Sequence, residues 1–392
     1  MTWKHYSLEQ SANRFDSSQD LTIGIEEEFQ ILNAKNLALT SRFDELHAAA
    51  REKLGAFVRG ELIASEIEIC TAKCHSLAEA EIDLKDKRRR LREAAREIDV
   101  VLSAAGTHPF SSWKDQQILD TPHYRLVEEQ LKYCAWRNIT FGMHTHIGVQ
   151  GHERMIQIFN SLRGYMPQLL ALSANSPFIE GRYTYLHSTR AQIFTRSFPR
   201  CNIPGPFRNW EDYARLIEMY FTTHSITEPT QVWWSLRPHP LLGTLEVRIC
   251  DVQCDASETL AISALAVALV AKLGEEIDDG KSLPVLSSNE IDENIWRATR
   301  FGLDGSLIDF GTLDEISTSD AILKLLDYTG DVLTQLGLVD YISRIPVMLE
   351  EGNGAQRQIR VYEETGDVPA VNSNNIARSR FDYSLTETGE RD

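Results

Sequence analysis

Two glutamates, Glu26 and Glu28, stand two residues apart in the segment LTIGIEEEFQIL at residues 21–32. In a β-strand successive side chains point to opposite faces, so both carboxylates project to one side while Glu27 projects to the other. Neighbouring carboxylates repel each other, and a divalent metal ion bound between them is the usual way to offset that repulsion. The segment therefore predicts part of a metal site. The alternative is a solvated edge strand. Glutamate is disfavoured in strands, however, so three consecutive glutamates are unusual for an ordinary edge strand.

A second acidic segment, ELIASEIEICT at residues 61–71, supplies three more glutamates. Glu66 and Glu68 share one face by simple alternation, whereas Glu61 and Glu68 are an odd number of residues apart. The latter two share a face only if a bulge or a turn interrupts the strand. The periodicity of the segment leaves open whether Glu61 or Glu66 faces the site.

Histidines and an acid–arginine pair recur at the same spacing further along the chain. The segment FGMHTHIGV puts His144 and His146 on one face of a strand, an arrangement that suits a metal or phosphate site. The segment TLEVRICD puts Glu246 beside Arg248, so that the acid is available to hold a metal ion and the guanidinium to contact phosphate oxygens. Structural histidines and an ordinary cross-strand ion pair are the alternatives.

The net charge of the chain is −17, which makes nucleic acid a poor partner for it. An anionic ligand such as a nucleotide must then be met by local positive charge, from arginines and metal ions. The segment at residues 174–200 supplies such charge among aromatic and polar residues, with Arg182, Arg190, Arg196 and Arg200. Taken one by one, arginines of this kind are more often surface residues than site residues.

The chain resembles the type 2 glutamate–cysteine ligases, also called YbdK-type carboxylate–amine ligases, in five segments: GIEEEF, ELIASEIEICT, GMHTHIGV, SANSPFIEGR and TLEVRICD. The resemblance covers about residues 20–365 and includes WRATRFGLDGSLID and GNGAQRQ near the C-terminus. More distantly, the acidic, histidine and Glu-x-Arg strands are similar to those of glutamine synthetase. The resemblance implies a glutamine synthetase-like fold, in which an antiparallel sheet holds magnesium ions between ATP and an acidic substrate.

The same resemblance implies roles for individual residues. Metal ligands are implied at Glu26, Glu28, Glu61, Glu68, His144 and Glu246. Arg248 is implied to be catalytic, on the transferred phosphate, and substrate or phosphate contacts are implied at His146, Arg190, Arg196, Arg200 and Arg237. The implied metal ligands include Glu61 and not Glu66, so the bulge or turn described above is required in this segment. At Ser235 the chain departs from the acidic residue expected in relatives, which leaves its amino-acid preference open.

These side chains share faces only if the segments that contain them are β-strands. Alternating segments with polar residues on one side predict strands at residues 21–32, 61–71, 140–149, 231–236 and 244–250. Helical spacing predicts helices at residues 76–106, 152–173, 210–223, 257–280 and 321–337. Together they predict an α+β fold with a largely antiparallel sheet, one face forming the active site and helices covering the other. The sequence contains neither G-x-G-x-x-G after a strand nor a P-loop motif, which argues against Rossmann and P-loop nucleotide sites.

With 392 residues and 42% hydrophobic content, the chain is long and apolar enough for a substantial core. Residues 20–371 are predicted to form a single catalytic domain with a helical C-terminal portion, about residues 290–371. The polar residues 1–19 and 372–392 are predicted to be a flexible N-terminus and a flexible tail. The sequence shows no signal peptide pattern and no apolar run long enough to span a bilayer. We therefore expect a cytoplasmic protein with reduced cysteines and no membrane partner.

The function expected from the residues and the resemblance is that of an ATP-dependent ligase that joins a carboxylate to an amine. Amide formation from a free carboxylate is uphill in water, so activation as an acyl phosphate, with Mg²⁺ or Mn²⁺ neutralising the phosphates, explains the residue types. The resemblance implies γ-glutamylcysteine formation from glutamate and cysteine. A guanidino kinase-like phosphotransferase and a catalytically weak nucleotide- or amino-acid-binding sensor are the alternatives. The sequence leaves open the true amine acceptor, the preferred carboxylate, the pathway and whether the chain forms a homo-oligomer.

Overall fold

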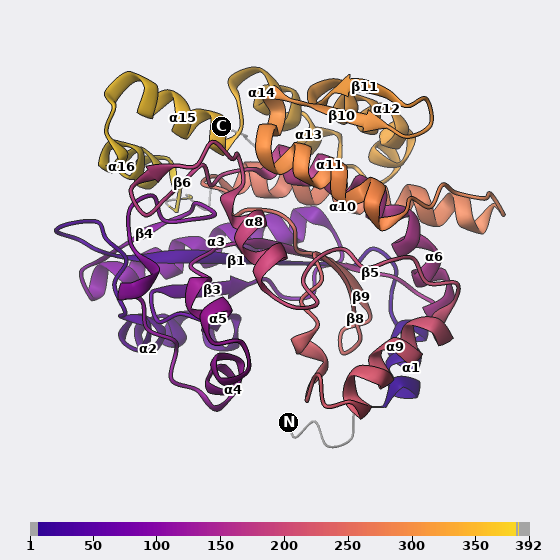
Figure 1. The fold of residues 1–392 in the computed structure, drawn as a ribbon, viewed down its shortest axis with the longest axis horizontal. Coiled ribbons are helices and arrows are strands. Elements are labelled where there is room, and N and C mark those ends of the chain that lie inside the picture. The colour runs from indigo at the N-terminus through magenta and orange to yellow at the C-terminus, as the bar shows by residue number, and fades with distance from the viewer. Residues whose placement is uncertain (1–6, 382, 384–392) are drawn as a thin grey trace.

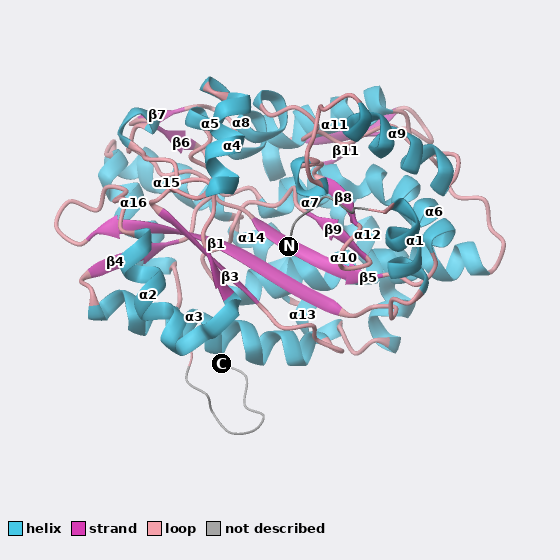
Figure 2. Ribbon diagram, turned by 90° about the horizontal axis from the view of Figure 1, so that it is seen from below, coloured by secondary structure: helices cyan, strands magenta, loops and turns pink. Residues whose placement is uncertain are grey.

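The computed structural model describes residues 7–381 and 383 of the chain. The central feature of these residues is a seven-stranded antiparallel sheet in the order β2-β3-β1-β5-β9-β8, with β4 paired to the second half of β1. Figure 2 shows its strands running diagonally across the molecule between flanking helices. The strands are β1 Ile23–Asn33, β2 Val58–Arg59, β3 Glu66–Cys70, β4 Val100–Ser103, β5 Met143–Gly148, β6 Phe178–Ile179, β7 Arg182–Tyr183, β8 Leu236–His239, β9 Thr244–Val247, β10 Ser306–Asp309 and β11 Asp314–Ser317.

The helices pack around this sheet and form most of the C-terminal part. They are α1 Leu8–Asp16, α2 Phe43–Leu54, α3 Leu77–Glu97, α4 Pro122–Leu131, α5 Tyr133–Arg137, α6 His152–Leu162, α7 Met166–Ser173, α8 Thr189–Ser197, α9 Trp210–Thr222, α10 Ala256–Asp278, α11 Ser288–Phe301, α12 Thr318–Gln335, α13 Val339–Ile342, α14 Arg344–Glu351, α15 Gly354–Thr365 and α16 Val368–Arg378. Helix α10 lies between the sheet and helices α12 to α14 (Figure 1). It is buried on nearly every side, as expected for a helix that is apolar all round. Among the described helices, none combines the length and hydrophobicity that a bilayer span requires.

The register of the sheet brings the chemistry-bearing side chains together. Residues directly opposite each other in an antiparallel pair lie on the same face. The opposed sets are Glu28 with Glu68, Glu26 with His144, and the row His146, Glu246 and Arg237. Strand pairing alone therefore collects on one face the acids, histidines and arginine that lie far apart in the sequence.

Glu27 points to the opposite face, where two helices hold it. Arg88 of α3 donates hydrogen bonds of 2.7 and 2.5 Å to its carboxylate, and Thr259 of α10 donates one of 2.6 Å. The side chains of Arg88 and Glu27 are both 0% exposed. A buried charge is tolerated only when it is paired and hydrogen-bonded, so this contact determines how α3 and α10 sit on the sheet. The predicted arrangement, with the site on one face and helices on the other, is confirmed.

The C-terminal end of the described chain returns to the sheet. The hydroxyl of Ser379 accepts the N–H of Ala104, just beyond β4, at 2.9 Å. The ring of Phe381 packs edge-on against Phe29 of β1, with 4.9 Å between the ring centroids. The first long strand and the last described residues therefore share one core.

Two predicted boundaries of ordered structure need correction. Residues 8–16, predicted as part of a flexible N-terminus, form helix α1, which Ser7 caps and which buries Phe15. Residues 372–378, predicted as the start of a flexible tail, form the end of α16. Each segment buries only a few side chains, so its composition is polar and resembles that of a flexible terminus although the segment is helical. The outer parts of these predictions, residues 1–6 and 384–392, lie outside the described residues.

The helix predicted at residues 76–106 is shorter than expected. It begins as predicted, with the hydroxyl of Ser76 accepting the N–H of Glu79, but α3 ends at Glu97. Residues 100–103 form β4 instead, because the second half of β1 offers an edge to pair with and Val100 and Val101 are β-branched.

Two further elements differ from the prediction. The helix predicted at residues 152–173 is divided into α6 and α7 by a 3₁₀ turn at Arg163–Tyr165. The strand predicted at residues 231–236 begins only at Leu236, because the chain first makes a 3₁₀ turn at Pro229–Gln231. That turn becomes part of the wall of the site described below.

Replacing Glu27 by glutamine tests whether its buried contact holds the helices to the sheet. The change leaves the Arg88 charge buried without its partner, so we expect the free energy of unfolding to fall by about 3 kcal/mol or more. Urea denaturation followed by circular dichroism measures this change. The control is Glu45→Gln, which removes an exposed ion pair with Arg42 and should barely move the urea midpoint. Equally small effects of both substitutions would contradict the assigned role of Glu27.

Candidate active site

The polar face of the sheet opens into a cavity of about 480 Å³. Its floor consists of Glu26, Glu28, Glu66, Glu68, His144, His146, Arg237, His239 and Arg248. Its walls come from other segments and include Arg59, Glu61, His123, Tyr124, Arg190, Phe194, Phe198, Glu228 and Trp233. Glu246 is fully buried beneath this floor.

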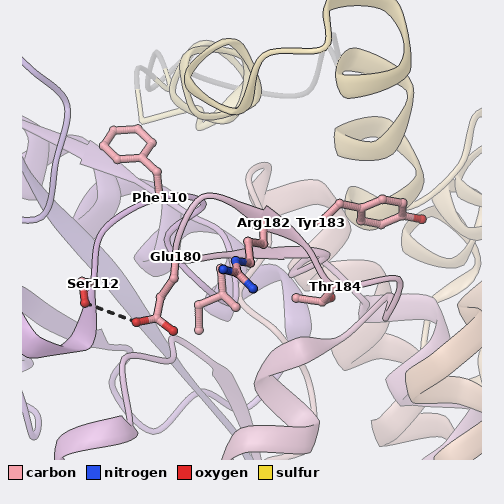
Figure 3. A pocket seen from close by; sticks show the side chains of 7 residues that line it. Phe110, Ser112, Glu180, Arg182, Tyr183 and Thr184 are labelled. Carbon is pink, nitrogen blue, oxygen red and sulfur yellow. Dashed lines mark hydrogen bonds between the residues drawn. The ribbon is translucent and has the colours of Figure 1, made fainter.

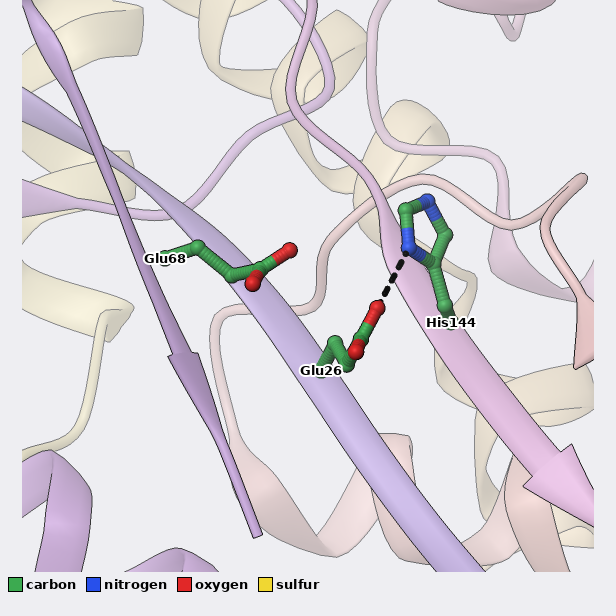
Figure 4. A group of neighbouring side chains, drawn as sticks. All are labelled: Glu26, Glu68 and His144. Carbon is green, nitrogen blue, oxygen red and sulfur yellow. Dashed lines mark hydrogen bonds and ion pairs between the residues drawn. The ribbon is translucent and has the colours of Figure 1, made fainter. Parts of the chain in front are cut away.

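One group of possible metal ligands consists of Glu26, Glu68 and His144. Figure 4 shows their side chains converging from β1, β3 and β5. His144 Nδ1 lies 3.2 Å from Glu26 Oε2, and each of the three residues offers a ligand atom within 4.8 Å of the others. His144 Nε2 is buried and has no hydrogen-bond partner among the described residues.

A second group shares Glu26 and adds His146 and Glu246. His146 Nε2 lies 3.5 Å from Glu26 Oε2 and 3.6 Å from Glu246 Oε1. Within the described part of the chain it too lacks a hydrogen-bond partner, while Nδ1 is 3.0 Å from the Thr244 hydroxyl. His146 was predicted from the sequence to contact substrate. Its position between Glu26 and Glu246 also suits a metal ligand.

The electrostatics of the floor and of Glu61 favour a divalent cation. Burial, and then the nearby Glu28 carboxylate, raise the pKa of Glu61 to about 8. Burial and the surrounding carboxylates likewise raise the pKa values of Glu66 and Glu68 well above their usual range. Burial also acts to raise the pKa of Glu26, but its histidine neighbours outweigh it and hold that pKa well below the usual range. Crowded carboxylates beside unpartnered imidazole nitrogens fit Mg²⁺ or Mn²⁺, which prefer carboxylate oxygens and accept nitrogen.

Both glutamates that the sequence left as alternatives line the cavity. Glu66 is on β3, on the same face as Glu68, whereas Glu61 lies in the irregular segment between β2 and β3. This segment supplies the strand irregularity that a role for Glu61 requires. Glu61 Oε2 accepts the Tyr124 hydroxyl at 3.4 Å, and Glu28 accepts a short hydrogen bond from the N–H of Gly142.

The arginines near Glu246 form a hydrogen-bonded cluster. Arg237 donates to both carboxylate oxygens of Glu246, at 2.6 and 3.0 Å, and Arg248 donates to Oε1 at 2.5 Å. Arg190 donates to the carbonyl oxygens of Arg248 and Ile249, each at 3.2 Å. The Nε atoms of Arg190 and Arg248 are buried without a hydrogen-bond partner among the described residues, so each retains a free donor.

Two predicted substrate contacts lie outside this cavity. Arg196 pairs with Asp292 at 3.2 Å and is partly exposed. Arg200 donates to the carbonyl oxygen of Gln231 and stacks near Trp233, one side chain removed from the cavity. Neither of the two arginines lines the cavity, so the structure does not bring them together with the other predicted substrate contacts.

Several cavity residues were missed by the sequence analysis: Arg59, His123, Tyr124, Glu228 and His239. His239 lies on β8 two residues after Arg237 and could have been found by the same alternation. The other four come from segments whose spacing gives no such signal, and the fold brings them to the wall. Ser235 is buried, donates to the carbonyl oxygen of Cys201 at 3.0 Å and does not line the cavity. The departure at this position therefore does not alter the surface that substrates meet.

A second cavity of about 480 Å³ lies beside the β6–β7 hairpin, lined by residues that include Phe110, Ser112, Glu180 and Arg182 (Figure 3). Glu180 accepts hydrogen bonds from Ser112 and Arg137. Among its described lining residues this cavity has no histidine and no group of metal-binding side chains. The catalytic chemistry is therefore assigned to the first cavity.

Two solved structures share the fold of this chain. The structure is similar to that of a glutamate–cysteine ligase from Francisella tularensis in complex with AMP, with a TM-score of 0.70 and 13% identity over 95% of this chain and 91% of that one. It is also similar to a bifunctional glutathione synthetase from Pasteurella multocida, with a TM-score of 0.65 and 14% identity over 95% of this chain and 53% of that one. These likenesses support the predicted glutamine synthetase-like α+β fold.

The chain belongs to glutamate–cysteine ligase family 2, whose model matches residues 22–374. Proteins provisionally named glutamate–cysteine ligase 2 from Solibacter usitatus and Herpetosiphon aurantiacus are each 40% identical to it, over 372 and 353 residues. The matches cover 94% and 89% of this chain, and 93% and 91% of the relatives. The family resemblance inferred from the sequence is confirmed, and with it the enzyme class of carbon–nitrogen ligases.

Replacing Glu68 by glutamine tests the metal group of Figure 4. The change removes one negative oxygen ligand, so we expect the affinity for Mn²⁺ to fall at least about tenfold, as measured by the electron paramagnetic resonance signal of free Mn²⁺. Glu218→Gln, an exposed position on α9, is the control and should bind Mn²⁺ like the wild type. Unchanged affinity in Glu68→Gln would remove this residue from the metal site.

Arg248→Lys should not be a conservative substitution. Guanidinium can bridge two phosphate oxygens, whereas ammonium is a point charge, so kcat should fall roughly 10²-fold if the contact forms in the transition state. Steady-state ADP release measures this effect, with the exposed Arg215→Lys as the control. An unchanged kcat with only a lower Tm would mean that Arg248 serves as a structural partner of Glu246.

Proposed function

We propose that this enzyme is an ATP-dependent ligase that forms an amide between the carboxylate of an acidic amino acid and an amine, through an acyl phosphate. The observation that carries the proposal is the cage of carboxylates and imidazoles beside Arg237 and Arg248. Activating a carboxylate with ATP demands neutralisation of phosphate charge more than it demands a nucleophilic side chain. The cavity contains the residue types that this chemistry needs.

In this proposal the ligands of Mg²⁺ or Mn²⁺ are Glu26, Glu28, Glu61, Glu68, His144 and Glu246. A divalent ion held there would supply positive charge against the phosphates of ATP and the transferred phosphoryl group. The protein holds its own ligands in place before ATP arrives, because Gly142 fixes Glu28 and two arginines fix Glu246. Prior positioning of this kind reduces the reorganisation that the reaction requires.

Arg248 and Arg237 act on the transferred phosphate and on the substrate. The unpartnered Nε of Arg248 leaves it a donor for a phosphate oxygen, while its Nη1 remains bonded to Glu246. Arg190 and His146 supply further polar contacts on the wall and floor of the cavity. The amine nitrogen then attacks the acyl carbon, phosphate leaves with the electrons of the broken C–O bond, and the amine loses a proton.

For the substrates we propose glutamate, activated at its γ-carboxylate, and cysteine as the named acceptor of the relatives. The support for glutamate and cysteine is the name carried by those relatives. A cytoplasmic location is part of the same proposal. It is supported by six cysteines that are all free thiols, as expected in a reducing compartment.

Hydroxylamine trapping tests the reaction class. With glutamate, ATP and Mg²⁺, we expect hydroxylamine to capture the activated carboxylate as a hydroxamate, which ferric chloride makes visible. Glutamate without any amine should support only slow ADP release, because water then intercepts the acyl phosphate. ATP consumption without hydroxamate, across glutamate and aspartate, would favour a guanidino kinase-like phosphotransferase. No turnover at all with a wide amino-acid panel would favour a binding sensor.

A further inference from the structure

Two side chains in the wall of the cavity have no part in the reaction proposed above. They are His123, in the first turn of α4, and Glu228, which directly precedes the 3₁₀ turn at Pro229–Gln231. His123 Nδ1 lies 2.5 Å from Glu228 Oε1. The pair joins two segments of the wall that lie far apart in the sequence.

This pairing leaves one ring nitrogen of the histidine available. The hydrogen bond from His123 lowers the pKa of Glu228 and outweighs the opposite effect of burial. The ionised carboxylate accepts the Nδ1 proton, so the lone pair of the neutral ring is on Nε2. Within the described residues Nε2 has no hydrogen-bond partner, and the His123 side chain is 39% exposed. An imidazole oriented by a carboxylate in this way is suited to act as a general base.

Contacts on both sides connect the pair to the carboxylate cage. The residue next to the histidine, Tyr124, places its hydroxyl 3.4 Å from Glu61 Oε2. On the other side, Arg237 binds Glu246 and also donates to the carbonyl oxygen of Val232 at 3.1 Å, just after the 3₁₀ turn. The pair and the cage line the same cavity. An amine bound in this cavity therefore shares it with both the metal groups and the free imidazole nitrogen.

The other imidazoles that line the cavity are less suited to accept a proton. His144 and His146 belong to the two groups of possible metal ligands. His239 is a weak base, because burial and then Arg237 lower its pKa to about 3. Among these imidazoles, His123 is the one that combines a carboxylate partner with a nitrogen outside the metal groups.

The proposed ligase reaction needs a proton acceptor. At neutral pH an organic amine is largely an ammonium ion, whose nitrogen has no lone pair with which to attack. Of its two surplus protons, one can leave with the phosphate as hydrogen phosphate. The other must be removed before the attack, so each amide formed from an ammonium ion releases one proton. A base in the cavity wall accelerates such a step.

We propose that His123 Nε2 is the general base that removes this proton, and that Glu228 is the positioning residue that orients the imidazole. The inference rests on the proposed ligase function and goes beyond it, because it assigns a catalytic residue to the amine step. An N–H bond of the ammonium ion breaks, its proton goes to Nε2 and its electron pair stays on nitrogen. That pair forms the C–N bond while the acyl C–O bond breaks, and phosphate takes the second proton. The partly exposed ring then returns its proton to water.

The first experiment compares two acceptors in the variant His123→Gln. Glutamine can still donate a hydrogen bond to Glu228, but it is not a base. Cysteine is largely an ammonium ion at neutral pH, whereas hydroxylamine is uncharged and has its lone pair available. We expect kcat with cysteine to fall at least about 10²-fold at unchanged KM, and kcat with hydroxylamine to fall at least about tenfold less. Equal losses with both acceptors, or a higher KM for cysteine at unchanged kcat, would overturn the proposal.

The second experiment is chemical rescue, which distinguishes a base from a structural contact. In His123→Ala, added imidazole should increase amide formation with cysteine at least about tenfold, whereas the wild type should not respond. The matched control is His152→Ala. His152 also begins a helix and pairs through Nδ1 with a carboxylate, that of Asp16 at 2.7 Å, but it does not line the cavity. This control should keep wild-type kcat values, and a correctly folded His123→Ala variant without rescue would contradict the assigned base.

Substitution of Glu228 tests its positioning role. Glu228→Gln no longer stabilises the protonated ring, so kcat with cysteine should fall at least about tenfold, and kcat with hydroxylamine should fall less. Glu228→Asp keeps the charge and should recover most of the loss. An unchanged kcat with cysteine in Glu228→Gln would show that Glu228 does not position the base.

The outcomes also separate this proposal from the proposed function. Wild-type turnover with cysteine in His123→Gln would reject the base and leave the ligase reaction intact. Hydroxamate without any cysteine amide in the wild type would reject cysteine as the acceptor, and with it the base assigned to that step. Absence of both products in the wild type would reject the ligase function itself.

Discussion

Three consecutive glutamates on β1 impose opposite demands on the two faces of the sheet. Glu26 and Glu28 project into the cavity, whereas Glu27 is buried against Arg88 and Thr259 on the helical side. A shift of the strand by one residue would exchange the faces, moving Glu27 into the cavity and forcing two carboxylates into the helical core. The charge pattern of β1 therefore fixes the register on which every cross-strand pair of the site depends.

The cavity is electrostatically asymmetric. On the β8–β9 side the protein neutralises its own acid, because Arg237 and Arg248 surround the buried Glu246. On the β3 side burial, and then neighbouring carboxylates that include Glu26 and Glu28, raise the pKa values of Glu61, Glu66 and Glu68. The unneutralised charge thus lies at one end of the cavity, and that is the end at which cations are needed.

Most of the site residues on strands could be predicted from the sequence, whereas most of those on the walls could not. The alternation of side chains along a strand was enough to predict that Glu26 shares a face with Glu28, and that His144 shares a face with His146. Glu61 required the family resemblance, since it lies in an irregular segment that no period describes. The sequence did not show which arginines of helix α8 face the cavity. Arg190 lines it, whereas Arg196, six residues later, lies about 240° further around the helix and pairs with Asp292. Glu228 and His123 come from distant segments that only tertiary packing brings together.

The contact between Phe29 and Phe381 joins an early strand to the last described part of the chain. Ser379 reinforces this closure through Ala104, and Arg88 donates to the carbonyl oxygen of Arg380. Contacts between residues this far apart in the sequence form late, because a long loop must close first. During synthesis the helical face of β1 therefore stays incomplete until Ser379 and Phe381 have left the ribosome. The newly made enzyme depends on that late step for protection of its apolar strand surface.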